Sequence, residues 1–324
     1  MEIESRIFAA FATAVFSAAA AIAPQVHAQI GTANNPFKQP LQSPSPESSG
    51  YFDLPIQRLK KSVPGLGGIR FDPRQDDLPG ILAGVDRKIA EELPRLPDLI
   101  SREEVFTFQG SSNTDGPGGV ASNEPSNREF KYLIHSHRAA NGSTIIEESR
   151  VNAKGELIRD QAGFTGLHAT GFANQWLFFS RANQPEFRFR YLGQQQKDGR
   201  KTFVVAFAQD PRKVADPAYF MSDGKTAPFY YQGVFWVDQT TFDIVALHTD
   251  LSAPVPQVHL FGLTTDLKFR SVPIRGYDAV FWLPSEVDIS SDQGRGPSEE
   301  SHRYSDYHLF HASAKIVTEP QPSN

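Results

Sequence analysis

Apolar residues recur with a helical period where the regular part of the chain begins. The positions that fall together on one face of such a helix are Leu78, Ile81, Leu82, Val85, Ile89 and Leu93. Two aspartates precede this run, Pro79 suits its first turn, and Pro94 follows its end. The pattern predicts an amphipathic helix that packs its apolar face against another element.

After this helix the period changes to two, which is typical of strands that bury one face. Phe106 and Phe108 alternate with polar residues, and Phe130 and Tyr132 do the same further on. The strands that this period predicts lie at about residues 106–108, 130–134, 144–151, 187–191, 203–207, 234–237, 243–247, 258–261, 265–269, 279–283, 286–289 and 303–310. The turn signals between them are Asn141-Gly142, Lys154-Gly155, Asp198-Gly199 and Asp238–Thr241.

A second helix is predicted from Thr170 to Asn183, with Phe172, Trp176 and Phe179 on one side and Pro185 closing it. Roughly ten short strands joined by tight turns, with two helices, indicate an α+β fold dominated by an antiparallel sheet.

The N-terminus has the order of a secretory signal. Arg6 is followed by an apolar run from Ile7 to Ala23 and by the small-residue triplet Val26-His27-Ala28. We expect cleavage after residue 28, hence export to the periplasm or cell envelope, and no transmembrane span in the mature chain. Residues 29–75 are rich in Pro, Ser and Gly, so we expect an arm or linker that contributes little to the fold. Residues 76–324 then form a single β-rich domain.

The composition limits the classes of function that the chain can have. The chain has no cysteine, so disulfides cannot stabilise it. Its net charge is −5, and charges of both signs are interspersed without a basic stripe. We therefore expect no nucleic-acid partner. The 25 phenylalanines are concentrated in the alternating stretches, which indicates aromatic sheet faces.

The middle of the chain resembles exported bacterial proteins of the outer-membrane lipoprotein-sorting superfamily, in a subgroup without an assigned function. The resemblance rests on the runs Phe187–Gly193, Lys197–Val205 and Tyr231–Val245, the last reading Y-Q-G-V-F-W-V-D-Q-T-T-F-D-I-V. It implies a curved, half-open antiparallel β-barrel or sheet with about two helices on its concave face. Gly233 would allow a close approach at a strand start, and Asp238–Thr241 would make a hairpin turn. Relatives carry lipoprotein acyl chains or sense lipoproteins, so a lipid, lipoprotein or envelope protein is the implied partner.

Aromatic residues make the candidate ligand-binding site. The residues expected to gather on one concave or inter-layer surface are Phe172, Trp176, Phe187, Phe189, Phe203, Val205, Phe207, Phe235 and Trp236. An ordinary aromatic core between sheet and helices is one interpretation. An apolar cleft for a hydrophobic ligand is the other.

Other candidate constellations are weaker. His135 and His137 share a strand face but lack a third ligand at convincing spacing, and His308 and His311 are no better placed, so no metal or other cofactor is expected. The pairs Glu147/Glu148 and Glu299/Glu300 should point to opposite faces of their strands and are interpreted as solvated charges.

No motif identifies a catalytic residue. We therefore expect a non-enzymatic extracytoplasmic binding or carrier-type protein for a hydrophobic ligand or lipoprotein. An interaction module of an envelope assembly and a hydrolase with an unrecognised site remain the alternatives.

Overall fold

The computed structural model describes residues 50–109, 126–138, 144–152, 154–158, 172–215, 217–222, 224–294 and 297–310. The predicted signal peptide, the first part of the predicted arm, the turn at Asn141-Gly142, Thr170 and His311 lie outside these ranges. Within them, no helix is both long enough and apolar enough to cross a membrane.

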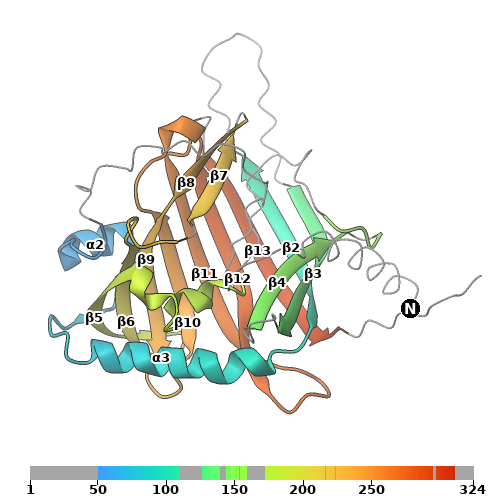
Figure 1. Cartoon of the computed structure of the whole chain (residues 1–324), viewed down its shortest axis with the longest axis horizontal. Helices are drawn as coiled ribbons and strands as arrows, with labels where there is room; N and C mark the ends of the chain where they lie inside the picture. Colours follow the sequence, from blue (N-terminus) through green and yellow to red (C-terminus); the bar gives the residue numbers. More distant parts are fainter. Residues whose placement is uncertain are drawn as a thin grey trace, which may run out of the picture.

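Eleven antiparallel strands form one open sheet, and two shorter strands form a separate hairpin (Figure 1). The sheet strands, in chain order, are β1 (Arg70–Phe71), β2 (Leu99–Gln109), β3 (Ser126–Arg138), β4 (Thr144–Val151), β5 (Phe187–Lys197), β6 (Arg200–Gln209), β9 (Tyr231–Asp238), β10 (Ile244–Leu251), β11 (Gly262–Pro273), β12 (Val280–Asp292) and β13 (Pro297–Leu309). Their order in space is β1-β5-β6-β9-β10-β11-β12-β13-β2-β3-β4. The separate hairpin is β7 (Ala218–Ser222) and β8 (Lys225–Phe229). The α+β fold with an unclosed antiparallel sheet, predicted from the sequence, is confirmed.

In the part of the chain that the structure describes, two α-helices lie against opposite faces of this sheet. α3 (Leu78–Glu92) spans the residues that the 3.6-residue period predicts and buries Ile81, Val85 and Ile89. α2 (Ile56–Ser62) lies on the other face with a 3₁₀ turn, η1 (Pro64–Leu66), behind it. Short 3₁₀ helices complete the set: η2 (Leu93–Arg95), η3 (Gln175–Phe179), η4 (Gln184–Glu186) and η5 (Pro256–Val258).

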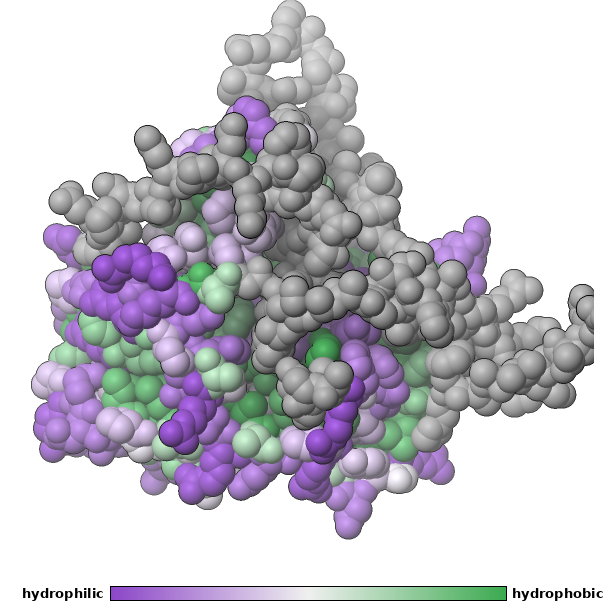
Figure 2. All heavy atoms as spheres, viewed as in Figure 1, coloured by the Kyte–Doolittle hydropathy of each residue, from purple (hydrophilic) through white to green (hydrophobic). Residues whose placement is uncertain are grey.

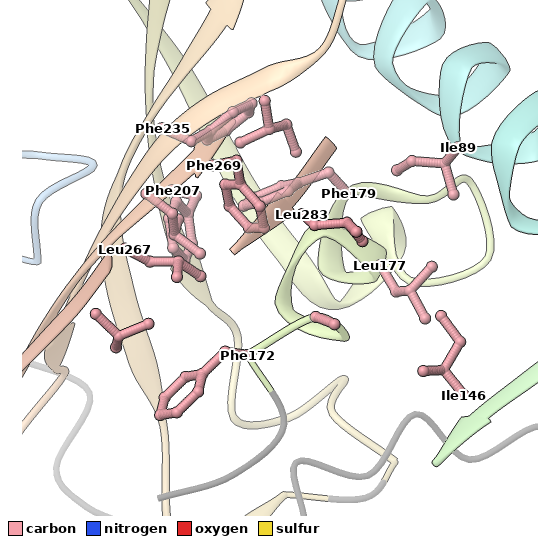
Figure 3. Packing of buried hydrophobic residues seen from close by; sticks show 14 of the residues in the cluster. Ile89, Ile146, Phe172, Leu177, Phe179, Phe207, Phe235, Leu267, Phe269 and Leu283 are labelled. Atoms are coloured by element: carbon pink, nitrogen blue, oxygen red, sulfur yellow. The ribbon is translucent and has the colours of Figure 1, made fainter. Parts of the chain in front are cut away.

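The larger core fills what we call the inner face, the one covered by α3, η3 and the β7–β8 hairpin. Strands from both ends of the sheet contribute to this one cluster, from Ile146 on β4 to Tyr191 on β5, so the sheet curves around it. Figure 3 shows side chains from α3 and η3 meeting the sheet residues between the layers. On the outside of this layer, hydrophilic and hydrophobic residues are interspersed (Figure 2).

A smaller core occupies the outer face, on the opposite side of the sheet. Leu59 of α2 and Leu66 of η1 are fully buried there, against Val204, Val234 and Trp236 of the sheet. Tyr51 and Ile69 are buried as well. The expectation that residues up to 75 contribute little to the fold is therefore wrong for the part from residue 50 onward. Apolar residues recur through this part of the chain, and Leu59, Val63 and Leu66 meet an apolar surface that the sheet provides.

The second predicted helix is not an α-helix. After a turn at residues 172–174, only the five residues of η3 are helical, and they are 3₁₀. The amide groups of Asn183 and Gln184 donate to the backbone carbonyls of Leu177 and Phe179, at 2.9 Å and 2.8 Å. Because side chains take these carbonyls, the backbone is not required to continue the helix.

Three strand predictions also change. Residues 258–261 do not form a strand, because Pro256 begins η5 and His259 has a φ of 54°. The strands predicted at 279–283 and 286–289 are one strand, β12, whose register shifts near Pro284. The β7–β8 hairpin was not predicted at all.

The predicted tight turns are confirmed where the structure describes them. Asp198 and Gly199 have φ values of 47° and 78°, as a two-residue hairpin turn requires. Asp238 accepts hydrogen bonds from the backbone N–H groups of Thr240 and Thr241, at 2.8 Å and 3.0 Å. At Gly233 a Cβ atom would lie 2.0 Å from the carbonyl oxygen of His248, so the predicted close approach is also confirmed.

Gly84 lets α3 approach the β9–β10 hairpin, and this contact is testable. A Cβ atom there would lie 2.3 Å from Cδ1 of Phe242. Gly84→Ala would gain about 0.5–1 kcal/mol of helix propensity, but overpacking costs about 1–3 kcal/mol. We expect a net loss in the free energy of unfolding, measured by denaturant titration. Gly80→Ala, on the same helix with nothing within 4 Å, is the control and should stabilise the protein slightly. Equal stabilisation by both variants would contradict the contact.

Candidate functional site

The aromatic residues predicted as a ligand site lie mainly in the inner core. The members that belong to this cluster or pack against it are Phe172, Trp176, Phe187, Phe189, Phe203, Val205, Phe207 and Phe235. Phe207 and Phe235 have no exposed surface. The period-two pattern places the six strand residues of this set on a common face, and Phe172 and Trp176 reach the same cluster from the segment of the second predicted helix.

Protein side chains occupy the space in front of these aromatic residues. Phe179 of η3 stacks on Phe235 with ring centroids 4.0 Å apart, and its edge meets Phe207 at 5.3 Å (Figure 3). Phe178 lies 5.8 Å from Phe187. The aromatic surface is thus packed against η3, which corresponds to the core interpretation rather than to an open cleft.

Trp236 does not join the other eight residues. It lies on the outer face, under η1, where Gly65 contacts its ring. Its Nε1 donates to Oε1 of Gln195 at 3.0 Å, and Nζ of Lys197 lies 4.7 Å from the ring centroid. Neighbouring residues of a strand point to opposite faces, so Phe235 and Trp236 could not share one surface.

A buried ionic network adjoins the aromatic core on the inner face. Glu103 of β2 is fully buried and receives Nε and Nη2 of Arg150 from β4, at 2.5 Å and 2.7 Å. Its Oε1 also accepts bonds from Nδ1 of His302 at 2.9 Å and from the hydroxyl of Tyr304 at 2.7 Å, both on β13. Three strands therefore converge on one carboxylate.

These contacts explain the pKa shifts of the residues in the network. Burial by itself raises the pKa of Glu103, but the charge of Arg150 and the bond from His302 outweigh it and hold the pKa well below its usual value. Burial would lower the pKa of His302, yet its bonds to Glu103 and Glu300 raise it. Glu103 is thus a permanent anion with its partners in place, which suits a structural ion pair better than a proton-transfer group.

A second, half-buried carboxylate anchors the segment that enters η3. Glu148 accepts the backbone N–H groups of Ala173 and Asn174, at 3.2 Å and 2.9 Å, and the hydroxyl of Tyr132. Burial raises its pKa. Glu148 and Glu300 were interpreted as solvated charges, which is wrong for both, because each faces the inner side of the sheet. The prediction that Glu147/Glu148 and Glu299/Glu300 point to opposite faces is confirmed, since Glu147 and Glu299 are exposed.

The outer face carries a groove with a volume of about 440 Å³. It runs across β11, β12, β13 and β2, and its lining residues are Phe106, Thr107, Phe108, Thr264, Asp266, Asp288, Ile289, Ser290, Glu299, Glu300 and Ser301. Phe106 and Phe108 stand at one end, 41% and 39% exposed. Such half-exposed rings beside a hollow are the kind of surface that contacts a ligand.

Strand register arranges the groove in two rows. One row reads Phe108, Glu299, Ser290, Thr264 and Asp250 across successive strands. The other reads Phe106, Ser301, Asp288, Asp266 and His248. Cross-strand partners share a face, so each row is a continuous strip of side chains. Apolar rings therefore lie at one end, and carboxylates, hydroxyl groups and His248 make up the rest.

His248 closes the far end of these rows. Its Nδ1 donates to Asp266 at 2.8 Å and its Nε2 to Asp250 at 3.0 Å. The hydroxyl of Tyr51 also bonds to Asp250, and its ring stacks on His248 at 6.4 Å. Burial lowers the pKa of His248, but the two carboxylates outweigh it and raise the pKa to about 9. A charged imidazole thus joins the docked N-terminal segment to the groove.

The predicted histidine pair does not form a larger ligand set. The rings of His135 and His137 lie 5.2 Å apart, and Nδ1 of His135 pairs with Asp98 at 2.8 Å. His308 bonds through Nδ1 to the carbonyl of Asp306. Within the described ranges, no three His, Asp or Glu residues are arranged to hold a metal ion.

Sequence reasoning missed both the ionic network and the groove. Single charges in alternating strands look like solvent-facing positions until their partners are known. The only signal was local: Phe106 and Phe108 stand out as apolar residues on the strand positions that turn out to be exposed.

Comparison with known proteins gives fold-level similarities only. No family model and no curated protein matches the chain. A DUF1329 family protein from Desulfovibrio piger is 12% identical, with 74% of this chain and 95% of that chain covered and a TM-score of 0.37. An outer membrane lipoprotein-sorting protein domain from Vibrio parahaemolyticus is 13% identical, with 70% and 92% covered and a TM-score of 0.35. Similarity at this level does not identify a function for this chain.

Neutralising Glu103 should be strongly destabilising. Glu103→Gln leaves the Arg150 guanidinium buried without its anion, for which we expect a loss of about 3–5 kcal/mol in the free energy of unfolding. The control, Glu104→Gln, removes a partly exposed charge that pairs with Arg102 and should cost at most about 1 kcal/mol. Denaturant titration of both variants measures the difference. Equal, small effects would show that the network is not a structural centre.

His248 should make stability depend on pH. Its pKa is raised to about 9 in the folded protein from an ordinary value of 6.5, so its contribution is complete below pH 6.5 and lost as pH rises through 9. We expect His248 to account for a fall in wild-type stability on the order of 3 kcal/mol across that window. His248→Gln should lose this part and keep the part due to His302, whose pKa is also raised. His308→Gln, which alters an exposed histidine, should retain the whole fall. An unchanged slope in His248→Gln would refute the assignment.

Proposed function

We propose that this protein is an exported, non-catalytic binding or carrier-type protein that holds a hydrophobic or amphiphilic ligand in the groove across β11, β12, β13 and β2. The observation that carries the proposal is the presence of two half-exposed phenylalanines, Phe106 and Phe108, at one end of a hollow of about 440 Å³. The signal-like N-terminus supports export.

The packing of the inner face argues against a ligand site there and so favours the outer groove. A ligand on the predicted aromatic surface would have to displace η3, because Phe179 already stacks on Phe235. Removing buried aromatic side chains from a packed core costs about 3–5 kcal/mol each. A ligand in the outer groove needs no such displacement.

The side chains near the groove also favour binding over hydrolysis. A general base must have a free nitrogen within hydrogen-bond reach of the group that it deprotonates. Both ring nitrogens of His248 are bonded to carboxylates, Asp250 and Asp266. The hydroxyl of Ser301 donates to Asp288 at 2.5 Å, and the pKa of that carboxylate is lowered. A carboxylate held as an anion in this way is a weak base.

The alternative of an interaction module has one specific observation in its favour. The segment from Tyr51 to Ile69 is docked on the sheet. We would expect such docking in a protein that presents its N-terminal region to an envelope assembly. In that case Phe106 and Phe108 would contact a protein surface and not a small ligand. The same experiment separates the two functions.

Truncating both rings tests the proposed site. The neutral fluorescent probe N-phenyl-1-naphthylamine should bind the wild-type protein, and Phe106→Ala/Phe108→Ala should weaken that binding at least tenfold, which corresponds to about 1.4 kcal/mol. Fluorescence titration measures binding. Phe71→Ala is the matched control, because Phe71 is 38% exposed at the opposite part of the sheet, on β1.

Stability measurements make the result interpretable. Substitutions of exposed residues usually change the free energy of unfolding by about 0.5 kcal/mol or less, so all variants should remain folded. Probe binding that survives the double substitution would place the ligand elsewhere. No binding to the wild type would remove the carrier proposal and leave the interaction module.

A further inference from the structure

We infer that the groove selects a cationic amphiphile: a molecule whose apolar part lies on Phe106 and Phe108 and whose positively charged headgroup lies among the carboxylates of the groove floor. This inference rests on the proposed function and adds the chemical class of the ligand. It is carried by the charges that strand register places side by side.

Two carboxylates face each other directly on the groove floor. Asp266 of β11 and Asp288 of β12 are cross-strand partners, and both line the groove. Like charges in directly opposed positions destabilise an antiparallel pair. Glu299 stands in the next row, beside Phe108. The floor therefore concentrates negative charge next to the apolar rings.

The cations nearby are shared among more carboxylates than they can neutralise. His248 divides its two N–H groups between Asp266 and Asp250. Arg303 contacts Asp288 at 3.0 Å and Glu286 at 3.4 Å, and Lys268 contacts Glu286 at 3.0 Å.

Glu299 adds one more negative charge to this imbalance between carboxylates and cations. No hydrogen bond or ion pair of its carboxylate lies within the ranges that the structure describes. Asp266, Asp288 and Glu299 line the groove, and Asp250 and Glu286 flank it. These five carboxylates face three cations, His248, Lys268 and Arg303, so the groove and its flanks have an excess of two negative charges. A ligand with a positive headgroup would gain from this excess, and a negative headgroup would be repelled.

The aromatic rings fit the same ligand. Phenylalanine faces attract cations as well as apolar groups, and quaternary ammonium groups are bound in this way. Because Phe108 and Glu299 are cross-strand partners, an ammonium group next to Glu299 lies within reach of a ring. The alkyl part of the ligand can then lie over Phe106 and Phe108.

Three probes with the same twelve-carbon chain test the inference. They are dodecyltrimethylammonium, dodecyl sulfate and the neutral dodecyl maltoside, each used below its critical micelle concentration. Isothermal titration of the whole protein at low ionic strength should give at least tenfold tighter binding of the cationic probe than of the anionic one. The preference should shrink at high salt, since exposed charges are screened.

Glu299→Gln locates the charge preference. We expect it to weaken binding of the cationic probe about three- to tenfold and to leave binding of the neutral probe unchanged. Glu91→Gln is the control, because Glu91 is an exposed residue of α3 on the other side of the molecule. It should change none of the three affinities.

The outcomes separate this inference from the function on which it rests. If none of the probes binds, the proposed function fails. If the neutral and anionic probes bind as tightly as the cationic one, the protein is a binding protein but the inference is overturned. A cationic preference that Glu299→Gln does not reduce would also overturn it, because the charge that selects the ligand would not lie in this groove.

Discussion

The buried carboxylate of Glu103 constrains how the whole sheet is assembled. An anion without access to water must receive its hydrogen bonds from the protein, and here they come from β4 and from β13, whose His302 lies 199 residues further along the chain. A one-residue slip of β13 would turn His302 and Tyr304 to the outer face. Glu103 therefore favours the observed register of β13 against β2, the pairing that joins β2, β3 and β4 to the rest of the sheet.

The ionic network and the aromatic core form one continuous filling of the inner face. The ring of Phe172, which lies just before η3, is 5.2 Å from that of His302 and 6.4 Å from that of Tyr304, so it contacts both. Glu148 holds the backbone of that segment in place. The inner face is filled in this way, and on the outer face α2 covers β5 to β10 while the groove lies over β11 to β2.

Features of the fold could be predicted from the sequence only where their signal lay within a few neighbouring residues. The helix at 78–92 and the turn at Asp198-Gly199 follow from spacing and backbone preference within a few residues. The helical spacing of Ile56, Leu59, Val63 and Leu66 was a local signal that the Pro- and Ser-rich composition obscured. The docking of Leu59 and Leu66 could not be predicted even so, because their partners are on distant strands. The groove was missed for a similar reason: Asp266 and Asp288 are unremarkable charges until β11 and β12 place them opposite each other.

The sequence by itself determined which residues share a face of each strand, because successive side chains point to opposite sides of a sheet. Alternation alone puts Phe235 and Trp236 on opposite faces, although both had been expected on one surface, and the structure shows Phe235 in the inner core and Trp236 in the outer one. Tertiary structure decided which strands lie next to each other and in what register. Those two choices bring Arg150 and His302 to Glu103, and Phe108 to Glu299. No local pattern encodes them, since each pair joins segments that meet only after the chain has folded.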